Sequence, residues 1–342
     1  MTEEQAVSRT AVAKPAIREP WIDIAKGIAI VLVVLYHSSL YLSEAGVVGL
    51  LAELNPLLDT FRMPLFFFMS GILGARVVTL GYRQLFRKRL LLLLYLYVVW
   101  VIAQQLFLRL MPPIRTDGDR GSWAGIANFL IFPNENLWFI YALPLFFTFA
   151  WLTRSLPRII PGTFAVLLSI AFGTGLLHTA TPWDKMGRYL VFFLFALWIG
   201  GWVRSLAPHV RWWHPVVALA IYAVLVVAML RFDLIRVPGV LLVVSCVAVA
   251  VGITAAVVLS RVPAFDVVRY LGTRTLPIYL VHTFPMIAVA GVLATGVVVP
   301  GWIATVLPLV LAAAAILIAL GVYRLLRGVP GIFTLPVASW AL

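Results

Sequence analysis

Long apolar runs are the feature of this sequence that most restricts how the chain can fold. The first, WIDIAKGIAIVLVVLYHSSLYL over 21–42, is long enough for an α-helix to cross a bilayer, and similar runs recur along the chain. The chain is 63% hydrophobic and only 11% charged, whereas about a quarter of the residues in a soluble domain are charged. Because backbone polar groups in lipid must be bonded within their own segment, the runs predict helices. We therefore expect an all-α, polytopic membrane helix bundle.

Ten membrane-spanning helices are predicted from these runs. We expect them at 22–42, 56–78, 90–111, 135–153, 159–178, 188–204, 214–231, 237–259, 274–295 and 302–323. If both termini are cytoplasmic, most of the 26 Lys and Arg residues lie on the inner side, as the positive-inside rule favours. Residues 1–20 would then form a disordered cytoplasmic tail, 21–325 one transmembrane domain, and 326–342 a short C-terminal tail.

Charge and cysteine content exclude several classes of function. The formal net charge is +13, but the basic residues lie between apolar runs and not in one soluble patch, so the expected partner is the bilayer and not nucleic acid. Apart from His209 and His214, which flank tryptophans, no pair of His or Cys residues has the spacing of metal ligands on a helix, and we expect no metal site. The single cysteine, Cys246, is expected to be a small buried hydrophobic residue.

Lys26 and His37 are a charged and a titratable residue within the first apolar run. Such groups are costly in hydrocarbon and usually have a function. Both lie on one helix face, roughly 16 Å apart along the axis. Asp23 lies on a similar face, but about 21 Å of helix separates it from His37, so these two cannot pair directly. Alternatively, Lys26 reaches the membrane edge beside Asp23, and His37 bonds to a neighbouring helix.

Two groups of polar residues lie near the second and third predicted helices. Asp59 and Arg62 could pair on one helix face, although an acidic residue near a helix start is also common by itself. A basic cluster follows on the cytoplasmic side, formed by Arg83, Arg87, Lys88 and Arg89. This cluster either anchors the chain at the inner membrane surface or binds a phosphorylated cofactor, because guanidinium groups suit phosphate.

The fourth and ninth predicted helices carry the remaining candidates. The segment NENLWFIYALPLF places Glu135, Trp138 and Tyr141 at the outer side. The two aromatic residues form an interfacial belt or, together with Glu135, line a sugar site. In LGTRTLPIYLVHTFP, Tyr279 and His282 share a helix face. His282 is the second histidine predicted within the bilayer, which favours a functional role for both intramembrane histidines.

Five segments resemble the acyltransferase-3 family of bacterial integral membrane proteins, and most closely its branch of fucose 4-O-acetylase-like proteins. They are WIDIAKGIAIVLVVLYH, FRMPLFFFMSG, RKRLLLLLYLYVVW, LWFIYAL and LGTRTLPIYLVHTFP. The resemblance covers about 21–325. Lys26 stands where the family usually has arginine, and Arg62 stands where this branch often has histidine. The basic cluster is also spaced differently from the pair of arginines with which the family's third helix usually begins.

This resemblance implies a membrane O-acyltransferase of the bacterial inner or plasma membrane, expected to be an acetyltransferase. The donor would be cytoplasmic acyl-CoA, most simply acetyl-CoA, with no tightly bound cofactor. The acceptor would be a hydroxyl of a cell-envelope glycan or glycolipid. His37 is expected to be the general base, because the ordinary histidine pKa of about 6.5 suits that role. A relayed acyl-histidine is the alternative.

The other candidate residues have expected roles in the same scheme. The catalytic group is His37, Asp23, His282 and Tyr279; the acyl-CoA-binding group is Lys26, Arg83, Arg87, Lys88 and Arg89; the acceptor-binding group is Asp59, Arg62, Glu135, Trp138 and Tyr141.

A transporter or flippase of a glycolipid or small solute is the rival function. Ion-coupled transport usually relies on carboxylates deep in the membrane, and the thirteen Asp and Glu residues fall in predicted tails, loops or helix ends. His37 and His282 could substitute for such carboxylates. A purely structural membrane protein would leave both histidines unexplained.

Overall fold

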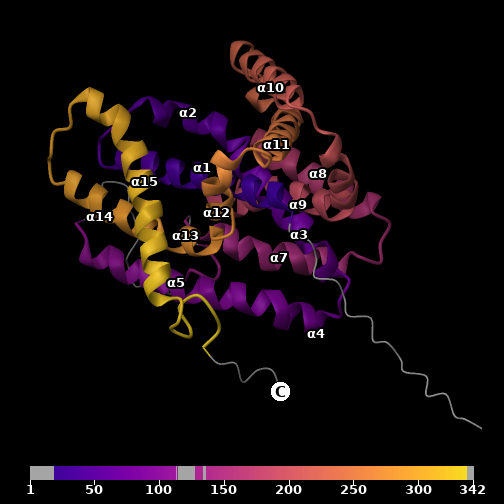
Figure 1. Ribbon diagram of the computed structural model, residues 1–342, viewed down its shortest axis with the longest axis horizontal. Helices are drawn as coiled ribbons and strands as arrows, with labels where there is room; N and C mark the ends of the chain where they lie inside the picture. The colour runs from indigo at the N-terminus through magenta and orange to yellow at the C-terminus, as the bar shows by residue number, and fades with distance from the viewer. Residues whose placement is uncertain (1–18, 113, 115–127, 134–135, 337–342) are drawn as a thin grey trace, which may run out of the picture.

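Helices dominate the computed structural model, which describes residues 19–112, 114, 128–133 and 136–336 (Figure 1). No strand occurs in these described ranges. The prediction of an all-α fold is therefore confirmed. The predictions for 1–18 and for Glu135 lie outside the described residues.

The helices follow the predicted apolar runs. In chain order they are α1 Pro20–Glu44, α2 Leu50–Asp59, α3 Arg62–Val78, α4 Tyr82–Leu85, α5 Leu91–Leu110, α7 Trp138–Leu152, α8 Ile159–Thr174, α9 Thr181–Leu206, α10 Trp213–Arg231, α11 Val240–Leu259, α12 Asp266–Gly272, α13 Thr275–Val281, α14 Thr283–Leu293 and α15 Gly301–Leu326. A π-helical turn at Phe86–Leu90 joins α4 to α5. Short 3-10 turns lie at Ala207–His209, Leu234–Arg236 and Pro263–Phe265.

Seven helical segments of the described chain are long and apolar enough to cross a membrane. An eighth arises if α2 and α3, which meet at a bend of about 40°, form one span. The apolar helices α7 and α8 are shorter, with 15 and 16 residues. They occupy the predicted spans 135–153 and 159–178, so a total of ten, like the orientation of the termini, stays a prediction.

The structure extends one predicted helix and adds another, and both changes involve segments that contain charged residues. The helix predicted from 188 begins at Thr181, because Pro182 occupies a first-turn position that suits proline. This places Lys185 on a helix and not in a loop, and it places Arg188 inside the helix and not at its start. The segment predicted as an inner connection after α11 contains a further helix, α12, which packs against α1.

The ninth predicted helix is broken into α13 and α14 at His282. Pro285 follows three residues later and has no backbone N–H, so it cannot donate to the carbonyl of Val281 one turn earlier. The break places His282 at the junction of two helices, deep in the bundle. Its side chain is fully buried.

Helices α1 and α12 cross closely because two glycines face each other. A Cβ added at Gly272 would overlap the backbone oxygen of Asp23 and crowd the nitrogen of Gly27, and a Cβ added at Gly27 would overlap the backbone oxygen of Val268. Only glycine permits this approach of two backbones. The contact fixes α1, which carries the first histidine, against the segment that leads into α13.

We expect Gly272→Ala to destabilise the protein by about 1–3 kcal/mol, because the added methyl group meets backbone atoms that cannot rotate away. The measurement is the thermal unfolding of the purified protein in detergent. Gly201→Ala in α9 is the control, because a Cβ there meets nothing within 4 Å. The control should be neutral or slightly stabilising. Equal melting temperatures for the two variants would contradict the proposed close crossing.

The helix α10 projects from the main body and packs chiefly on α11 (Figure 1). Of its side chains, only Val226 and Met229 are buried. The prediction that Cys246 on α11 is buried was wrong, because this cysteine lies exposed on the outside of the bundle. In a membrane an apolar side chain gains little by leaving lipid for protein, so apolar character does not indicate a core position.

Candidate active site

His37 and His282 meet in the interior although 245 residues separate them in the sequence. His37 Nδ1 and His282 Nε2 are 3.0 Å apart, which is a hydrogen-bond distance. His37 is 5% exposed and His282 is 0% exposed. The sequence predicted both residues within the bilayer, and the structure joins them into one pair.

The second nitrogen of His282 determines how protons are arranged in this pair. His282 Nδ1 lies 2.9 Å from the backbone oxygen of Tyr279 and 3.1 Å from that of Ile278. A carbonyl oxygen can only accept, so Nδ1 carries the proton and Nε2 of the neutral ring is an acceptor. His37 Nδ1 must then donate to His282 Nε2. This leaves His37 Nε2 with a lone pair, as a general base or nucleophile requires.

A cavity of about 220 Å³ lies next to Tyr279, and neither histidine is among the residues that line it. Its lining includes Lys26, Ser70, Arg89, Thr275 and Tyr279, together with apolar side chains of α3, α5 and α7. The ring centroid of Tyr279 is 5.9 Å from that of His282. The volume is below the roughly 300–1,000 Å³ of sites for drug-sized ligands, so the cavity suits a slender chain.

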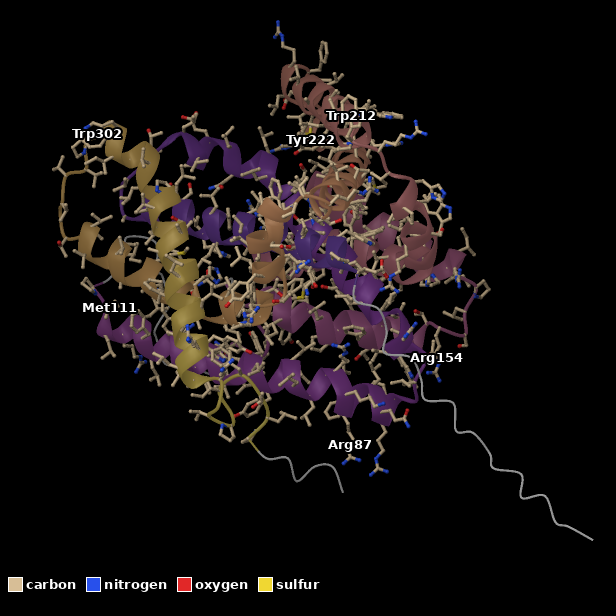
Figure 2. All side chains as sticks on the ribbon, in the orientation of Figure 1. Arg87, Met111, Arg154, Trp212, Tyr222 and Trp302 are labelled. Carbon is tan, nitrogen blue, oxygen red and sulfur yellow. The ribbon has the colours of Figure 1, made fainter. Side chains whose placement is uncertain are left out.

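Of the predicted acyl-CoA-binding residues, the cavity unites only Lys26 and Arg89. Arg83, Arg87 and Lys88 are exposed and do not line it. Figure 2 shows the Arg87 side chain at the edge of the molecule, pointing away from the bundle. For these three residues, membrane anchoring and binding of a phosphorylated donor both stay predictions.

Asp23 lies beside Lys26 and not beside His37. Its Oδ1 is 3.4 Å from Lys26 Nζ, and its side chain is 6% exposed against 19% for that of Lys26. The helical distance of about 21 Å to His37 holds in the continuous helix α1. The geometry therefore makes Asp23 a partner that positions the Lys26 ammonium at the cavity.

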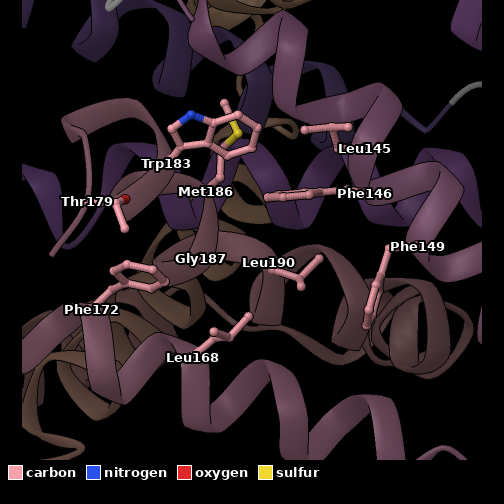
Figure 3. Close-up of a pocket in the computed structure, with 10 residues that line it drawn as sticks. All are labelled: Leu145, Phe146, Phe149, Leu168, Phe172, Thr179, Trp183, Met186, Gly187 and Leu190. Atoms are coloured by element: carbon pink, nitrogen blue, oxygen red, sulfur yellow. The ribbon is translucent and has the colours of Figure 1, made fainter. Parts of the chain in front are cut away.

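A second cavity is an open apolar groove lined by side chains of α7, α8 and α9. It has a volume of about 530 Å³ and is lined by side chains such as Phe146, Phe149, Phe172 and Trp183 (Figure 3). Among the residues that line it, Thr179 carries the side-chain oxygen seen in the close-up. Nothing in this groove resembles a catalytic group.

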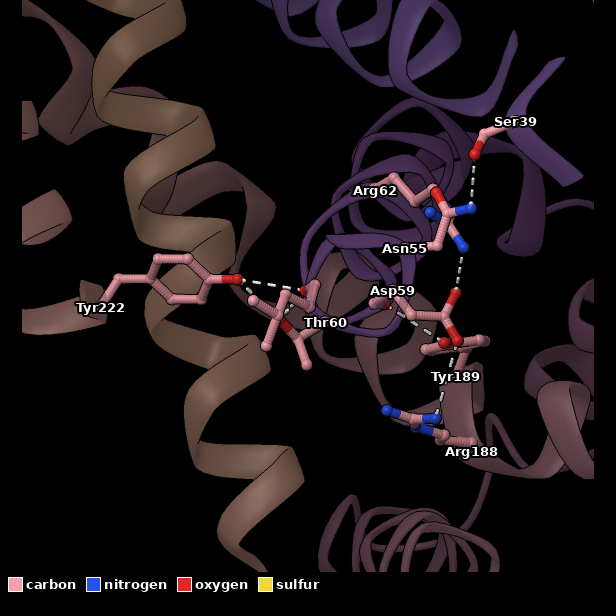
Figure 4. A network of polar contacts seen from close by, with 9 residues as sticks. Ser39, Asn55, Asp59, Thr60, Arg62, Arg188, Tyr189 and Tyr222 are labelled. Carbon is pink, nitrogen blue, oxygen red and sulfur yellow. Dashed lines mark hydrogen bonds and ion pairs between the residues drawn. The ribbon is translucent and has the colours of Figure 1, made fainter. Parts of the chain in front are cut away.

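A polar network surrounds Asp59, where α2 ends and α3 begins (Figure 4). Arg62 Nη2 lies 2.8 Å from Asp59 Oδ1, so the predicted pairing of these two residues is confirmed. Arg188 Nη1 is 3.9 Å from Asp59 Oδ2, and the Tyr189 hydroxyl donates to the Asp59 backbone oxygen at 3.3 Å. One carboxylate therefore faces two guanidinium groups from two helices.

The predicted acceptor residues of α7 are only partly at this network. Trp138 is 4% exposed and its ring packs beside Tyr189, with Lys185 Nζ 5.9 Å above the ring. This burial excludes the interfacial belt for Trp138. Tyr141 is half-buried further along α7, where its hydroxyl donates to the backbone oxygen of Leu130. Tyr141 therefore does not share the surroundings of Trp138.

The sequence reasoning missed several residues of this region. Lys185 was missed because the start of α9 was predicted too late, and Arg188 was missed as the first residue of that predicted helix, although charged residues at the edge of an apolar run are themselves a signal. Gln104 on α5 is fully buried and its Nε2 donates to Thr283, the residue after His282. Among the described residues, no group of three or more His, Cys, Asp and Glu side chains could hold a metal ion.

Comparisons with known proteins identify the family of this chain. The profile of acyltransferase family 3, described as an acyltransferase domain, matches residues 19–324. The inner membrane protein YcfT of Escherichia coli (strain K12) is 28% identical over 223 residues, which cover 56% of this chain and 59% of that protein. The match thus spans less than two thirds of this relative's length. No solved structure matches the chain significantly.

Proposed function

Because the chain belongs to the acyltransferase-3 family and is a multi-pass membrane acyltransferase, we propose that it acylates a hydroxyl of a cell-envelope glycan or glycolipid, with acyl-CoA as donor. The observation that carries this proposal is the His37–His282 hydrogen bond, which leaves one imidazole nitrogen unprotonated. The ring of Tyr279 connects this pair to a cavity lined by Lys26 and Arg89. The inner-membrane location of the relative YcfT agrees with a bacterial inner membrane as the site of action.

The donor binds from the cavity side in this proposal. Lys26 and Arg89 hold the charged nucleotide part of acyl-CoA at the mouth, since ammonium and guanidinium groups suit phosphate. The pantetheine arm, which is slender and largely apolar, enters along the side chains of α3, α5 and α7. Tyr279, at the inner wall, directs the thioester toward the histidine pair. Acetyl is the simplest acyl group for so narrow a cavity.

The chemical step then uses His37 as a general base. The acceptor oxygen bonds to the thioester carbon while its proton moves to His37 Nε2, and the carbon–sulfur bond breaks. The CoA thiolate takes the proton from His37 as it leaves. During the step, the positive charge on His37 is shared with His282, whose own proton is held by backbone carbonyls. Groups that stabilise a developing charge are most effective when they are already oriented before the reaction.

The test is acyl transfer in sealed vesicles of native membranes that contain the acceptor. Inside-out and right-side-out vesicles are incubated with acetyl-labelled CoA, and the label in lipid and glycan fractions is counted. We expect transfer in inside-out vesicles only, because the donor site opens to the cytoplasm in this proposal. Solute flux without any consumption of acyl-CoA, including longer acyl donors, would overturn the proposal and favour a transporter.

Removing the two cavity cations should weaken donor binding more than catalysis. We expect Lys26→Gln and Arg89→Gln each to raise the KM for acetyl-CoA by about tenfold with a smaller change in kcat, because each ion contact to phosphate contributes about 1.5–3 kcal/mol at most. The measurement is steady-state CoA release at varied acetyl-CoA. Arg83→Gln is the matched control, since Arg83 lies nearby but outside the cavity. Equal KM changes in all three variants would reject the assigned donor site.

A further inference from the structure

Positive charge exceeds negative charge at the end of α3 opposite the donor cavity. Arg62 on α3 and Arg188 on α9 face the same carboxylate, Asp59, at 2.8 and 3.9 Å. Lys185 lies one turn before Arg188 and extends over Trp138. Among these described residues, three cations therefore lie near one anion. An excess of this kind attracts a negatively charged ligand.

Arg62 has bonding capacity that the described chain does not use. Its side chain is 3% exposed, and its Nη1 has no hydrogen-bond partner among the described residues. Its guanidinium plane lies 3.7 Å from the ring centroid of Tyr36, which holds it in place. A buried charged donor without a partner is costly, and binding sites are where such donors are retained.

Arg62 is connected to His37 through the ring of Tyr36, and it does not line the donor cavity. The ring of Tyr36, under Arg62, contacts the ring of His37 edge-on at 5.0 Å. Arg62 and Lys185 are both close enough to act electrostatically on His37. In contrast, the cavity is lined by Phe66, Ser70 and Leu73, which lie further along the same helix α3. Arg62 and Lys185 therefore form a group of cations separate from Lys26 and Arg89, which line the donor cavity.

We propose that Arg62, Arg188 and Lys185 form an anion site that holds a carboxylate or phosphate of the acceptor, which is therefore an anionic and not a neutral glycan or glycolipid. The role as acceptor site rests on the proposed function, whereas anion binding does not. Guanidinium groups bind both oxyanions through paired hydrogen bonds. Asp59 holds the two arginines apart until the ligand's anion takes the free donors.

The experiment measures sugar binding to purified full-length protein in detergent at constant ionic strength. The probes are glucuronate, glucose 1-phosphate and neutral glucose, titrated against the melting temperature. The background is the Lys26→Gln/Arg89→Gln double variant, which lacks the cations of the donor cavity. We expect at least one anionic sugar to bind about tenfold or more tightly than glucose, since charge-assisted bonds are roughly twice as strong as neutral ones. The better of the two anions identifies the oxyanion as carboxylate or phosphate.

Variants of the network separate an anion site from a merely structural ion pair. Arg62→Gln should remove the preference for anionic sugars, and Arg188→Gln should reduce it about tenfold. Asp59→Asn should strengthen anion binding, because it removes the competing carboxylate. A structural ion pair would not produce this gain. If the buried Arg62 variant does not fold, Arg188 and Asp59, with 21% and 26% exposed side chains, still test the site.

Two results would overturn the anion site: equal affinity for glucose and both anionic sugars, or a preference that survives Arg188→Gln unchanged and does not rise in Asp59→Asn. Acetyl-CoA consumption by the wild-type protein is measured in parallel to separate the two proposals. Acyl-CoA consumption without anion preference leaves the acyltransferase reaction intact and rejects the anion site. Anion preference without consumption of any acyl-CoA upholds the anion site and rejects the proposed function.

Discussion

His37→Ala should lower kcat for acyl transfer by about 10²- to 10⁴-fold, the range that one general base contributes. The expectation follows from the proton arrangement, because His37 Nε2 is the nitrogen of the pair that is left with a lone pair. Binding of acyl-CoA should change little, since Lys26 and Arg89 line the cavity and His37 does not. The loss should therefore fall on kcat and not on KM.

The measurement is acetyl-CoA turnover by purified protein with native membrane extract as the source of acceptor. His214→Ala is the matched control, because His214 lies half-buried at the start of α10, where its Nδ1 bonds to the backbone of Arg211 and its ring stacks on Trp213. Turnover near the wild-type level in the His37→Ala variant would refute the base assignment. A rapid-quench experiment separates direct transfer from a relay, since an acyl group found on the peptide that contains His37 would indicate an acyl-histidine.

The placement of Lys26 and His37 on one face of the first helix could be predicted from the sequence, because it depends only on helical geometry. Lys26 and His37 lie on one continuous helix, and the structure confirms that helix over Pro20–Glu44. The exclusion of an Asp23–His37 contact is of the same kind. Local spacing likewise predicted the Asp59–Arg62 pair, which is three residues apart on adjoining helix ends.

The meeting of His37 with His282 could not be predicted in the same way. It joins residues 245 positions apart, and hydropathy does not show which helices are neighbours in a membrane. The meeting also depends on the break before Pro285 and on the close crossing at Gly272. Both features are local in the sequence, but together they bring two distant parts of the chain, at His37 and His282, into contact.

The residues of the proposed anion site were missed for a different reason. The start of α9 lies seven residues before the predicted position. Lys185 therefore fell in a predicted loop, and Arg188 was the first residue of the predicted helix. Arg62 was noticed, but its unused Nη1 becomes visible only when all of its neighbours are placed.

The second large effect is expected at His282, through its hold on His37. His282→Leu removes the acceptor for the His37 Nδ1 proton, so the His37 ring loses its fixed tautomer and its orientation. We expect kcat to fall by roughly 10²- to 10⁴-fold, as when the residue that orients a catalytic histidine is lost. The effect of a residue that acts through another should not add to the loss of that other residue. The His37→Ala/His282→Leu double variant should therefore be no slower than His37→Ala.

Two amide variants distinguish orientation from simple packing at this position. The amide of Gln reaches the place of His282 Nε2 and can accept from His37, so His282→Gln should retain much of the activity. The amide of Asn reaches only the place of Nδ1, beside the carbonyl of Tyr279, so His282→Asn should be nearly as slow as His282→Leu. A purely volume-dependent role would instead leave His282→Leu about as active as His282→Gln, because Leu and Gln are both close to histidine in size, and only the smaller Asn would be slow. Comparing kcat for the three variants, after confirming equal melting temperatures, decides whether the histidine pair is a catalytic unit or a buried contact between two helices.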